Sequence, residues 1–555
     1  MISRTTSDFL RAPWLRRILV LALPLGALAV AALLPAGVRA ASIAFLPTDG
    51  HTGPEPTSVE LDDAGNLYTA NLNFGGPGGV TKITPAGTGS QFGGDIRAAA
   101  GVAVDAGGNL FVTSAWFATI YKLTPDGTMN PALPWPVSVA DSPNNVVLDR
   151  SGNLYTAGIN TNWISKISPS GAVTTPFALT GDTPGSIAID TAGNLYTSNF
   201  FDATVDGTVT KVTPDGATTV NFAPTGQFPG DLTTDPAGNV YVVNRNDNNV
   251  TKITPNGQTT TPFAATGTSP FAIAIDSAGN LFVSNFQGGN VTRITPAGVS
   301  SALIPPGTID GSPDEMTIDS SGNLYVTVRS GGSPGAHVDT VARISPDPGS
   351  SEIAPAPPNR PAAPTATAGK LSASVSVPAN PASARYGKPS SYTVTAVEDP
   401  SKRCTVTPPS TICTVTGLTA GTAYTFTARA NLNSWQTGPS ATSAPVKPTV
   451  SVTISSPKAK VTRNSVLVTS KVRVSGAGKI SQRATTKKGK KTKTWCRASK
   501  TATQSGTHTL KCNLGKTGRT ALRKATLKLT LRTTFTPTGG SAVTADRKLT
   551  LKRKR

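Results

Sequence analysis

Histidine and glutamate are scarce in this chain of 555 residues, which holds only three histidines. Between residues 41 and 350 the only histidines are His51 and His337, and the only glutamates are Glu55, Glu60 and Glu315. General acid–base catalysis needs a titratable side chain within hydrogen-bonding reach of the proton that it moves. This scarcity argues against a histidine-based active site in that stretch, and we predict no catalytic residue there.

Long apolar runs are also rare, because the chain has one, from Ile18 to Leu34. Arg16 and Arg17 precede it, and a small-residue site ending at Ala40 follows it. This pattern predicts a secretory signal peptide over 1–40 and an extracellular protein, secreted or at the cell surface. The alternative is an uncleaved membrane anchor. The lack of a second run predicts no further membrane span, and the lack of cysteine at the cleavage site excludes a bacterial lipoprotein.

Cysteine is limited to four residues in two close pairs, without any C-x-x-C spacing. In an exported protein these pairs predict the disulfides Cys404–Cys413 and Cys496–Cys512. A zinc site is the alternative, but His508 is the only histidine near either pair.

A helix-favouring composition and a strict G-X-Y period are both absent, while Thr, Val, Ser, Gly and Pro dominate. This composition excludes collagen and predicts strands and turns. Acidic residues are nearly absent from residues 450–555, where Asp546 stands against 27 Lys and Arg, a net charge of +26. Residues 41–350 carry −14, so the overall charge of +21 belongs to a basic C-terminal region that follows an acidic body.

A sequence motif recurs seven times between residues 41 and 350, as in TPGSIAIDTAGNLY at residues 183–196. The copies are 41 to 45 residues apart and each contains a marker asparagine: Asn66, Asn109, Asn153, Asn194, Asn239, Asn280 and Asn323. A period of this length, with several short strands in each copy, is typical of a β-propeller blade. We therefore predict a seven-bladed β-propeller with four strands in each blade.

Most charged residues of these copies occupy repeated positions and are predicted to be scaffold. The repeated acid precedes each marker, as Asp190 does in the fourth copy, and the repeated base follows it on a later strand, as Lys211 does. The aromatic residue two positions after the marker, such as Tyr196, is predicted to be core.

The motifs D-x-x-G-N-[LV]-[YF] and K-I-T-P-x-G resemble those of NHL-repeat propellers and of the streptogramin lyase-like and gluconolactonase-like propellers. This group contains both enzymes and binding scaffolds, so the resemblance implies the fold more than an activity. It implies His, Glu and magnesium for a lyase, and a divalent metal held by carboxylate and amide oxygens for a lactonase. No cofactor is predicted, although Asp231 and Glu315 are candidate ligands for Ca²⁺ or Mg²⁺ in the channel.

Ligands of such propellers usually lie over the channel, near the residue five positions after each marker. Four of these residues are Asn, which can form hydrogen bonds but cannot act as acid or base. Aromatic residues that follow the second strands could add an apolar rim, unless they pack between neighbouring loops. The predicted ligand-binding residues are Asn71, Ser114, Trp116, Trp163, Asn199, Phe200, Asn244 and Asn285.

Two further β regions are predicted after the propeller. Residues 351–361 are rich in Pro and Ala and are predicted to be a linker. Residues 362–449 resemble a fibronectin type III domain, because Gly417 to Tyr424 match the corner before its sixth strand and Tyr424 matches its corner tyrosine. The early-strand tryptophan of that family is missing. Such a domain implies a spacer or an adhesive module.

Apolar and polar side chains alternate along residues 450–555, which predicts a basic Ig-like sandwich cross-linked by the second disulfide. The charge predicts a polyanionic partner, and the export signal favours an anionic cell-wall polymer or polysaccharide over nucleic acid. The residues predicted to bind it are Lys487, Lys488, Lys490, Lys491 and Lys493.

Together these features predict an all-β secreted protein that uses a propeller for ligand recognition and a basic module for retention or adhesion at the cell surface. The alternative is a secreted metal-dependent lyase or lactonase of the propeller type.

Overall fold

A computed structural model describes residues 41–46, 55–72, 79–129, 135–139, 142–200, 205–329, 339–346, 352–489, 491–538 and 541–553. The predicted signal peptide over 1–40 lies outside these ranges, as do His51 and His337. No helix in the described part of the chain is long and apolar enough to cross a membrane.

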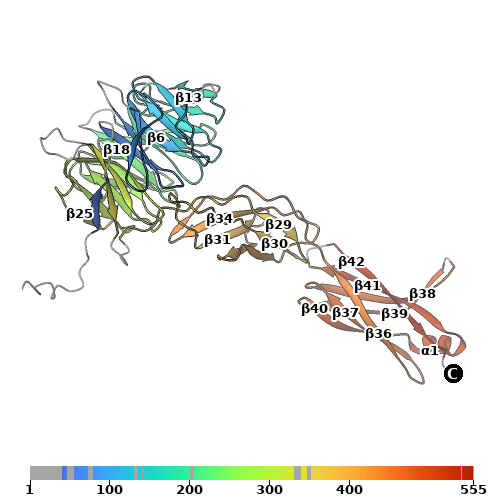
Figure 1. The fold of residues 1–555 in the computed structure, drawn as a ribbon. Helices are drawn as coiled ribbons and strands as arrows, with labels where there is room; N and C mark the ends of the chain where they lie inside the picture. The colour runs from blue at the N-terminus through green and yellow to red at the C-terminus, as the bar shows by residue number, and fades with distance from the viewer. Residues whose placement is uncertain are drawn as a thin grey trace, which may run out of the picture. The chain divides into compact units, whose positions relative to one another are not determined.

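Four-stranded antiparallel sheets follow one another through the described residues from Ser42 to Ser345, and they are arranged in a ring (Figure 1). The innermost strand of one sheet packs on that of the next: β18 contacts both β14 and β22, and β2 contacts both β6 and β26. The ring is therefore closed, and the predicted all-β propeller is confirmed. Its strands are β1 (Ser42–Phe45), β2 (Pro56–Leu61), β3 (Leu67–Asn71), β4 (Gly79–Ile83), β5 (Gly89–Phe92), β6 (Ala99–Val104), β7 (Leu110–Ser114), β8 (Thr119–Leu123), β9 (Val137–Ser138), β10 (Val147–Leu148), β11 (Leu154–Gly158), β12 (Trp163–Ile167), β13 (Val173–Leu179), β14 (Pro184–Ile189), β15 (Leu195–Asn199), β16 (Asp206–Val212), β17 (Thr218–Gln227), β18 (Pro229–Thr234), β19 (Val240–Asn244), β20 (Asn249–Ile253), β21 (Thr259–Ala265), β22 (Pro270–Ile275), β23 (Leu281–Asn285), β24 (Asn290–Ile294), β25 (Ser300–Ile304), β26 (Ser312–Ile318), β27 (Leu324–Arg329) and β28 (Thr340–Ser345).

The last sheet combines both ends of the propeller. Strand β1 pairs antiparallel with β28, with Ser42 opposite Ser345 and Phe45 opposite Ala342. The sheet order is β1-β28-β27-β26, so the first strand of the region completes the sheet formed by the last copy of the motif. This pairing joins the two ends of the ring by backbone hydrogen bonds.

The repeated charged residues form a hydrogen-bonded turn within each sheet. In the fourth copy, Asp190 Oδ1 accepts from the backbone N–H of Ala192 and Asn194, and Asp190 Oδ2 accepts from Asn194 Nδ2 at 2.7 Å and from the Tyr196 hydroxyl at 3.2 Å. The Lys211 ammonium lies 5.7 Å from the centre of the Tyr196 ring. These contacts satisfy the buried polar groups of the turn, which explains the recurrence of Asp, Asn, Tyr and Lys.

Residues 365–436 form two sheets whose buried side chains share one core. The first has the order β29-β30-β33 and the second β32-β31-β34-β35. The disulfide Cys404–Cys413 is present with an S–S distance of 2.01 Å, and the Tyr424 hydroxyl accepts a hydrogen bond from the Thr419 N–H at 3.2 Å. The fibronectin type III assignment stays a prediction. The strands are β29 (Thr365–Ala368), β30 (Ser372–Ser376), β31 (Ser391–Ala396), β32 (Arg403–Val406), β33 (Ile412–Thr416), β34 (Phe426–Leu432) and β35 (Trp435–Gln436).

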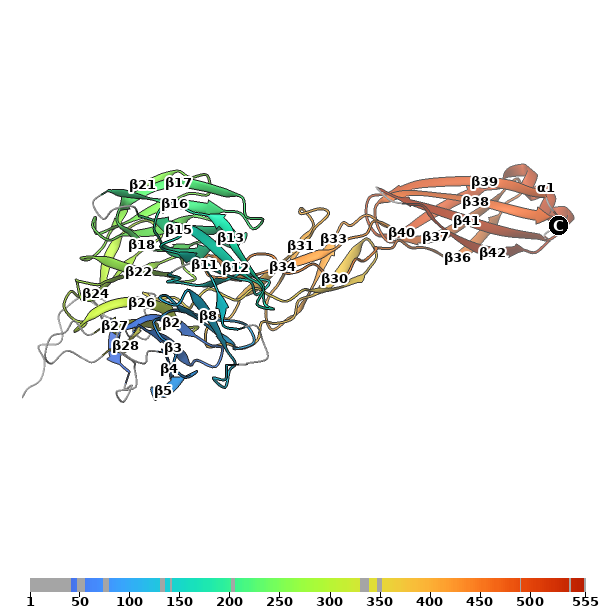
Figure 2. The same ribbon diagram turned by 90° about the horizontal axis from the view of Figure 1, so that it is seen from above.

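Residues 452–551 form a second pair of packed sheets, ordered β36-β37-β40 and β39-β38-β41-β42 (Figure 2). The disulfide Cys496–Cys512 links them, as predicted. A helix, α1 (Gly515–Lys524), joins β40 to β41 where no helix was predicted, and Arg523 and Lys524 in its last turn complement its dipole. The strands are β36 (Val452–Val461), β37 (Val466–Val474), β38 (Gly478–Lys488), β39 (Lys491–Ala502), β40 (Gly506–Asn513), β41 (Leu527–Pro537) and β42 (Val543–Leu551).

Candidate functional site

A cavity of about 230 Å³ lies where the inner strands of the propeller begin. Each sheet contributes residues at the start of its inner strand, so the cavity occupies the mouth of the central channel. Its lining residues are Thr57, Ser58, Leu72, Ala100, Asn144, Asn145, Ile159, Gly185, Ser186, Phe200, Phe228, Pro229, Gly230, Asp231, Arg245, Phe271, Glu315 and Arg329.

One wall of this cavity is an aromatic stack that holds an arginine. The guanidinium carbon of Arg245 lies 5.0 Å from the centre of the Phe228 ring and 4.6 Å from that of Phe271. Phe200 meets Phe228 edge to face, with ring centres 4.7 Å apart. Because the two rings fix the guanidinium between them, its N–H groups are oriented in advance for a ligand.

A cluster of carboxyl groups lies at the same cavity. Asp231 accepts hydrogen bonds from Ser186 Oγ at 2.7 Å and from the Ile273 N–H at 3.0 Å, while Glu315 accepts from the Met316 N–H at 3.2 Å. Asp314, which has no exposed side-chain surface, forms an ion pair with Arg329. Three carboxyl groups and two guanidinium groups thus share a small volume.

Burial dominates the electrostatics of these acids. It raises the pKa of Asp314 to about 7, against the lowering effect of Arg329. The pKa of Asp231 is also raised by burial, and that of Glu315 is raised well above its usual range by burial and by the neighbouring Asp231 and Asp314. A carboxyl group that keeps its proton near neutral pH can donate a hydrogen bond or exchange a proton with a ligand.

The donor set of the site does not fit a divalent cation. Both oxygens of Asp231 already accept hydrogen bonds, and Asp314 is paired with Arg329. Two guanidinium groups in the same site also oppose a cation electrostatically. Within the described ranges, no group of three or more His, Cys, Asp or Glu residues is arranged to hold a metal ion.

Three of the residues selected from the sequence line the cavity: Phe200, Asp231 and Glu315. The five polar residues predicted to bind ligand are buried and form hydrogen bonds inside their own sheets. Asn71, Asn199, Asn244 and Asn285 each donate to a threonine of the next strand at 2.8 to 3.0 Å, and Ser114 donates to the carbonyl oxygen of Arg97 at 2.6 Å.

The two predicted tryptophans lie outside the cavity lining. Trp116 is 58% exposed, and the Trp163 Nε1–H donates to Thr175 Oγ1 at 3.1 Å. Their role in ligand binding stays a prediction. The lysine residues predicted to bind polyanion form part of the hairpin between β38 and β39, where Lys487, Lys491 and Lys493 are exposed, while Lys490 lies outside the described residues.

Sequence reasoning missed Phe228, Arg245, Phe271, Asp314 and Arg329. A signal for three of them was present. Arg245 and Arg329 share one repeat position, six residues after the marker, where the other five copies have uncharged residues, and Asp314 is the only charged residue at its own repeat position. A charge that breaks the repeat is therefore better evidence of a site than one that follows it.

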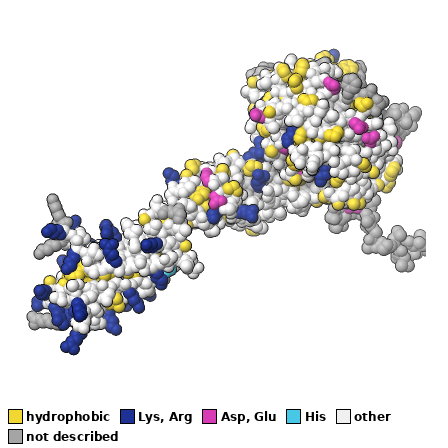
Figure 3. Space-filling view, turned by 180° about the vertical axis from the view of Figure 1, so that it is seen from behind, with side chains coloured by type: hydrophobic (Ala, Val, Ile, Leu, Met, Phe, Trp, Pro, Cys, Tyr) yellow, Lys and Arg dark blue, Asp and Glu magenta, His cyan; other side chains and the backbone are white. Residues whose placement is uncertain are grey.

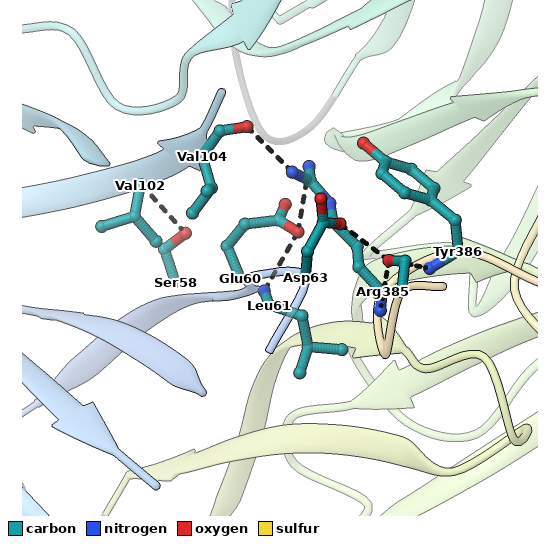
Figure 4. Close-up of polar contacts among 9 residues, drawn as sticks. Ser58, Glu60, Leu61, Asp63, Val102, Val104, Arg385 and Tyr386 are labelled. Atoms are coloured by element: carbon teal, nitrogen blue, oxygen red, sulfur yellow. Dashed lines mark hydrogen bonds and ion pairs between the residues drawn. The ribbon is translucent and has the colours of Figure 1, made fainter. Parts of the chain in front are cut away.

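Another cluster lies further along the same inner strand β2, at Glu60. Arg385, from the region after the propeller, places Nη2 3.2 Å from Glu60 Oε1 and donates from Nη1 to the Val104 carbonyl oxygen at 2.8 Å (Figure 4). Ser383 donates to Asp63 at 2.7 Å, and the Tyr386 ring lies 5.0 Å from the Arg385 guanidinium carbon. These contacts attach the loop at residues 383–386 to the propeller.

Comparison with solved structures finds several matches at low identity. The virginiamycin B lyase of Staphylococcus aureus is 16% identical, with 55% of this chain and 98% of that one covered and a TM-score of 0.42. The calcium-binding protein regucalcin of Agrobacterium tumefaciens is 15% identical over 44% of this chain and 89% of its own, with a TM-score of 0.34. The extracellular domain of a B. thetaiotaomicron protein is 13% identical over 74% of this chain and 58% of its own, with a TM-score of 0.39.

No curated protein matches the chain. The model of the virginiamycin B lyase family matches residues 51–333, which is more than half of the chain and includes all of the residues that line the cavity. The chain therefore belongs to the virginiamycin B lyase family.

Proposed function

We propose that this protein binds a small anionic ligand with a flat or apolar part in the cavity of the propeller, and that its basic region from residue 450 retains it on anionic polymers of the cell surface. The observation that carries the first half is the Arg245 guanidinium held between Phe228 and Phe271. An anionic group on the ligand would accept hydrogen bonds from Arg245, while its apolar part would contact the rings.

The carboxyl groups support this choice of ligand. Because the pKa values of Glu315 and Asp231 are raised, these side chains carry less negative charge near neutral pH than exposed carboxylates would. A protonated Glu315 could then donate to the ligand instead of repelling it. Arg329 is already paired with Asp314, which leaves Arg245 as the cation of the cavity that would meet the ligand.

A titration calorimetry experiment with phenylacetate and its neutral amide tests this proposal. We expect phenylacetate to bind the full chain more tightly than phenylacetamide, and Arg245→Met to remove the preference. Arg97→Met is the matched control, because Arg97 is 67% exposed and outside the cavity lining. Equal binding of the two compounds, or no effect of Arg245→Met, would contradict the assignment.

The second candidate function is a secreted lyase or lactonase. Membership of the virginiamycin B lyase family favours it, and a carboxyl group with a raised pKa such as Glu315 suits proton transfer. The described propeller residues include no histidine, and among them Glu315 is the group that we propose for the proton transfer. Mass spectrometry after incubation with virginiamycin B tests this activity. Ring opening that Glu315→Gln abolishes would establish the enzyme, and an unchanged substrate would argue for the binding function alone.

A further inference from the structure

Three arginines lie side by side across the four-stranded sheet of residues 478–551. In the register of this sheet, Arg483 on β38 is directly opposite Arg497 on β39 and Arg532 on β41, and Arg532 is opposite Asp546 on β42. All four side chains are exposed, on the face turned away from the buried residues Ala484 and Leu531. One row therefore crosses the whole sheet with three cations and one anion.

This row is poorly neutralised by the protein itself. Arg532 donates to both oxygens of Asp546, at 2.9 and 2.7 Å. The side chains of Arg483 and Arg497 form no hydrogen bond or ion pair with any described residue, and Asp546 is the only acidic residue from 450 to 555. Like charges directly opposite one another destabilise a sheet, so folding alone does not explain this arrangement.

The other sheet of the same region shows that the row is not a consequence of composition. Its exposed face also carries cations, but each is opposite an uncharged residue. Lys471 lies between Ser455 and Thr509, Arg473 lies between Thr453 and Thr507, and Lys458 is opposite Thr469. In this sheet no cation is thus directly opposite another, while in the sheet of residues 478–551 three arginines are opposite one another in a single row.

Short hydroxyl side chains border the arginine row on both sides. The preceding row is Ser499, Ser481, Thr534 and Thr544, and the following row is Thr494, Thr485, Thr530 and the exposed Lys548. The hydroxyl residues make a low surface along the arginines, and each hydroxyl can donate and accept. A ligand that places carboxylates on the guanidinium groups would find partners for its own hydroxyl groups beside them.

We propose that this face binds an acidic polysaccharide, a chain of hydroxyl-rich sugars that carry carboxylate groups, and that Arg483, Arg497 and Arg532 are its main contacts. This inference rests on the retention half of the proposed function and names its ligand class and site. Figure 3 shows Lys and Arg side chains gathered over residues 452–551, with the acidic side chains in view elsewhere on the molecule. Arginine suits carboxylate because its planar fork can donate two parallel hydrogen bonds.

The test compares two triple variants of the full chain that lose the same charge. Arg483→Gln/Arg497→Gln/Arg532→Gln removes the row, and Lys458→Gln/Lys471→Gln/Arg473→Gln removes three cations from the other sheet. Binding of polygalacturonate is measured by biolayer interferometry at 50 and 300 mM NaCl, with polyphosphate and neutral dextran as further probes. Circular dichroism at both salt concentrations verifies that the variants are folded.

We expect the row variant to bind polygalacturonate at least ten-fold more weakly than the unmodified chain, and the control variant to change it less than three-fold. Equal losses would show that only total charge matters and would overturn the assignment of the site, while leaving retention intact. Polyphosphate bound through the row without polygalacturonate would overturn the ligand class. Failure of the unmodified chain to bind any polyanion would overturn retention itself.

Discussion

The propeller and the C-terminal sandwich are both antiparallel β structures, but they place their charges in opposite ways. In the propeller the informative charges point inward, where Asp314 is fully buried against Arg329 and the guanidinium of Arg245 lies between two rings. In the sandwich they point outward, where Arg483 and Arg497 face solvent on one sheet. The net charge of +21 is a sum over regions that arrange their charges differently, so it describes neither the propeller nor the sandwich.

The difference determines how each region responds to its environment. Buried charges depend on specific partners and on pH, because desolvation makes an unpaired ion unfavourable. Exposed charges contribute little to folding and are screened by salt, since the Debye length at physiological ionic strength is about 8 Å. The propeller should therefore be sensitive to single substitutions and to pH, and the sandwich to salt.

The largest effect is expected from Arg329→Met at pH 8, above the pKa of about 7 of Asp314, because an ionised carboxylate is then left buried without a partner. We expect it to lower the free energy of unfolding by about 3 to 5 kcal/mol, as removal of one member of a buried ion pair usually does. Urea denaturation followed by tryptophan fluorescence measures this. The matched variant Asp314→Asn/Arg329→Met should recover much of the loss, because a neutral amide needs no counterion. A double variant as unstable as the single one would show that packing of Arg329, rather than charge, is responsible.

The pH dependence of the propeller should be the next largest effect. The pKa of Asp314 is about 7 in the folded state and about 3.9 in an unfolded chain, so the folded state binds this proton more tightly. Stability from this group is complete below about pH 4 and is lost as the pH rises through 7. Between pH 5 and pH 8 we expect a decrease of about 2 to 3 kcal/mol in the free energy of unfolding.

The same direction is expected for Asp231 and Glu315, whose pKa values are also raised. Arg245 and Arg329 are the cationic side chains near this cluster. Urea midpoints measured from pH 5 to 8 test the prediction, and Asp314→Asn should flatten the curve. A stability that rises with pH over this interval would contradict a buried, protonated carboxyl cluster.

A smaller effect is expected where the loop at residues 383–386 meets the propeller. Arg385→Met removes the ion pair with Glu60 and the hydrogen bond to the Val104 carbonyl oxygen. Both charged side chains are partly exposed, at 18% and 24%, so we expect a loss of about 1 to 2 kcal/mol. Hydrogen exchange of strands β2 and β6 should report it locally. Arg403→Met, an exposed residue of β32, is the control, and equal protection in both variants would exclude a role for the contact.

Much of the propeller could be predicted from its repeat, because the motif recurs at a nearly constant period and most copies have the turn from Asp to Tyr. The site could be predicted less well. The spacing correctly places Asn199 at the end of a strand, but it does not reveal that the side chain donates to Thr210 on the next strand. The arginine row is harder still, because alternation of apolar residues shows which side chains face out and not which strands are neighbours.

The smallest effect is expected from Arg483→Gln. The sign of its change in the free energy of unfolding tests most directly whether the exposed charges of the sandwich, unlike the buried charges of the propeller, contribute little to folding. Arg483 has an arginine opposite it on each side and no carboxylate in its own strand pair, so its removal should relieve repulsion. We expect the free energy of unfolding to stay constant or to rise by about 0.2 to 0.5 kcal/mol at 50 mM NaCl, and the gain to disappear at 1 M NaCl. Lys471→Gln, which removes a cation flanked by Ser455 and Thr509, should give no such gain. A clear loss of stability in Arg483→Gln would mean that this arginine serves the fold. A gain would mean that the chain tolerates repulsion in the row, which is the expected property of residues kept for a ligand.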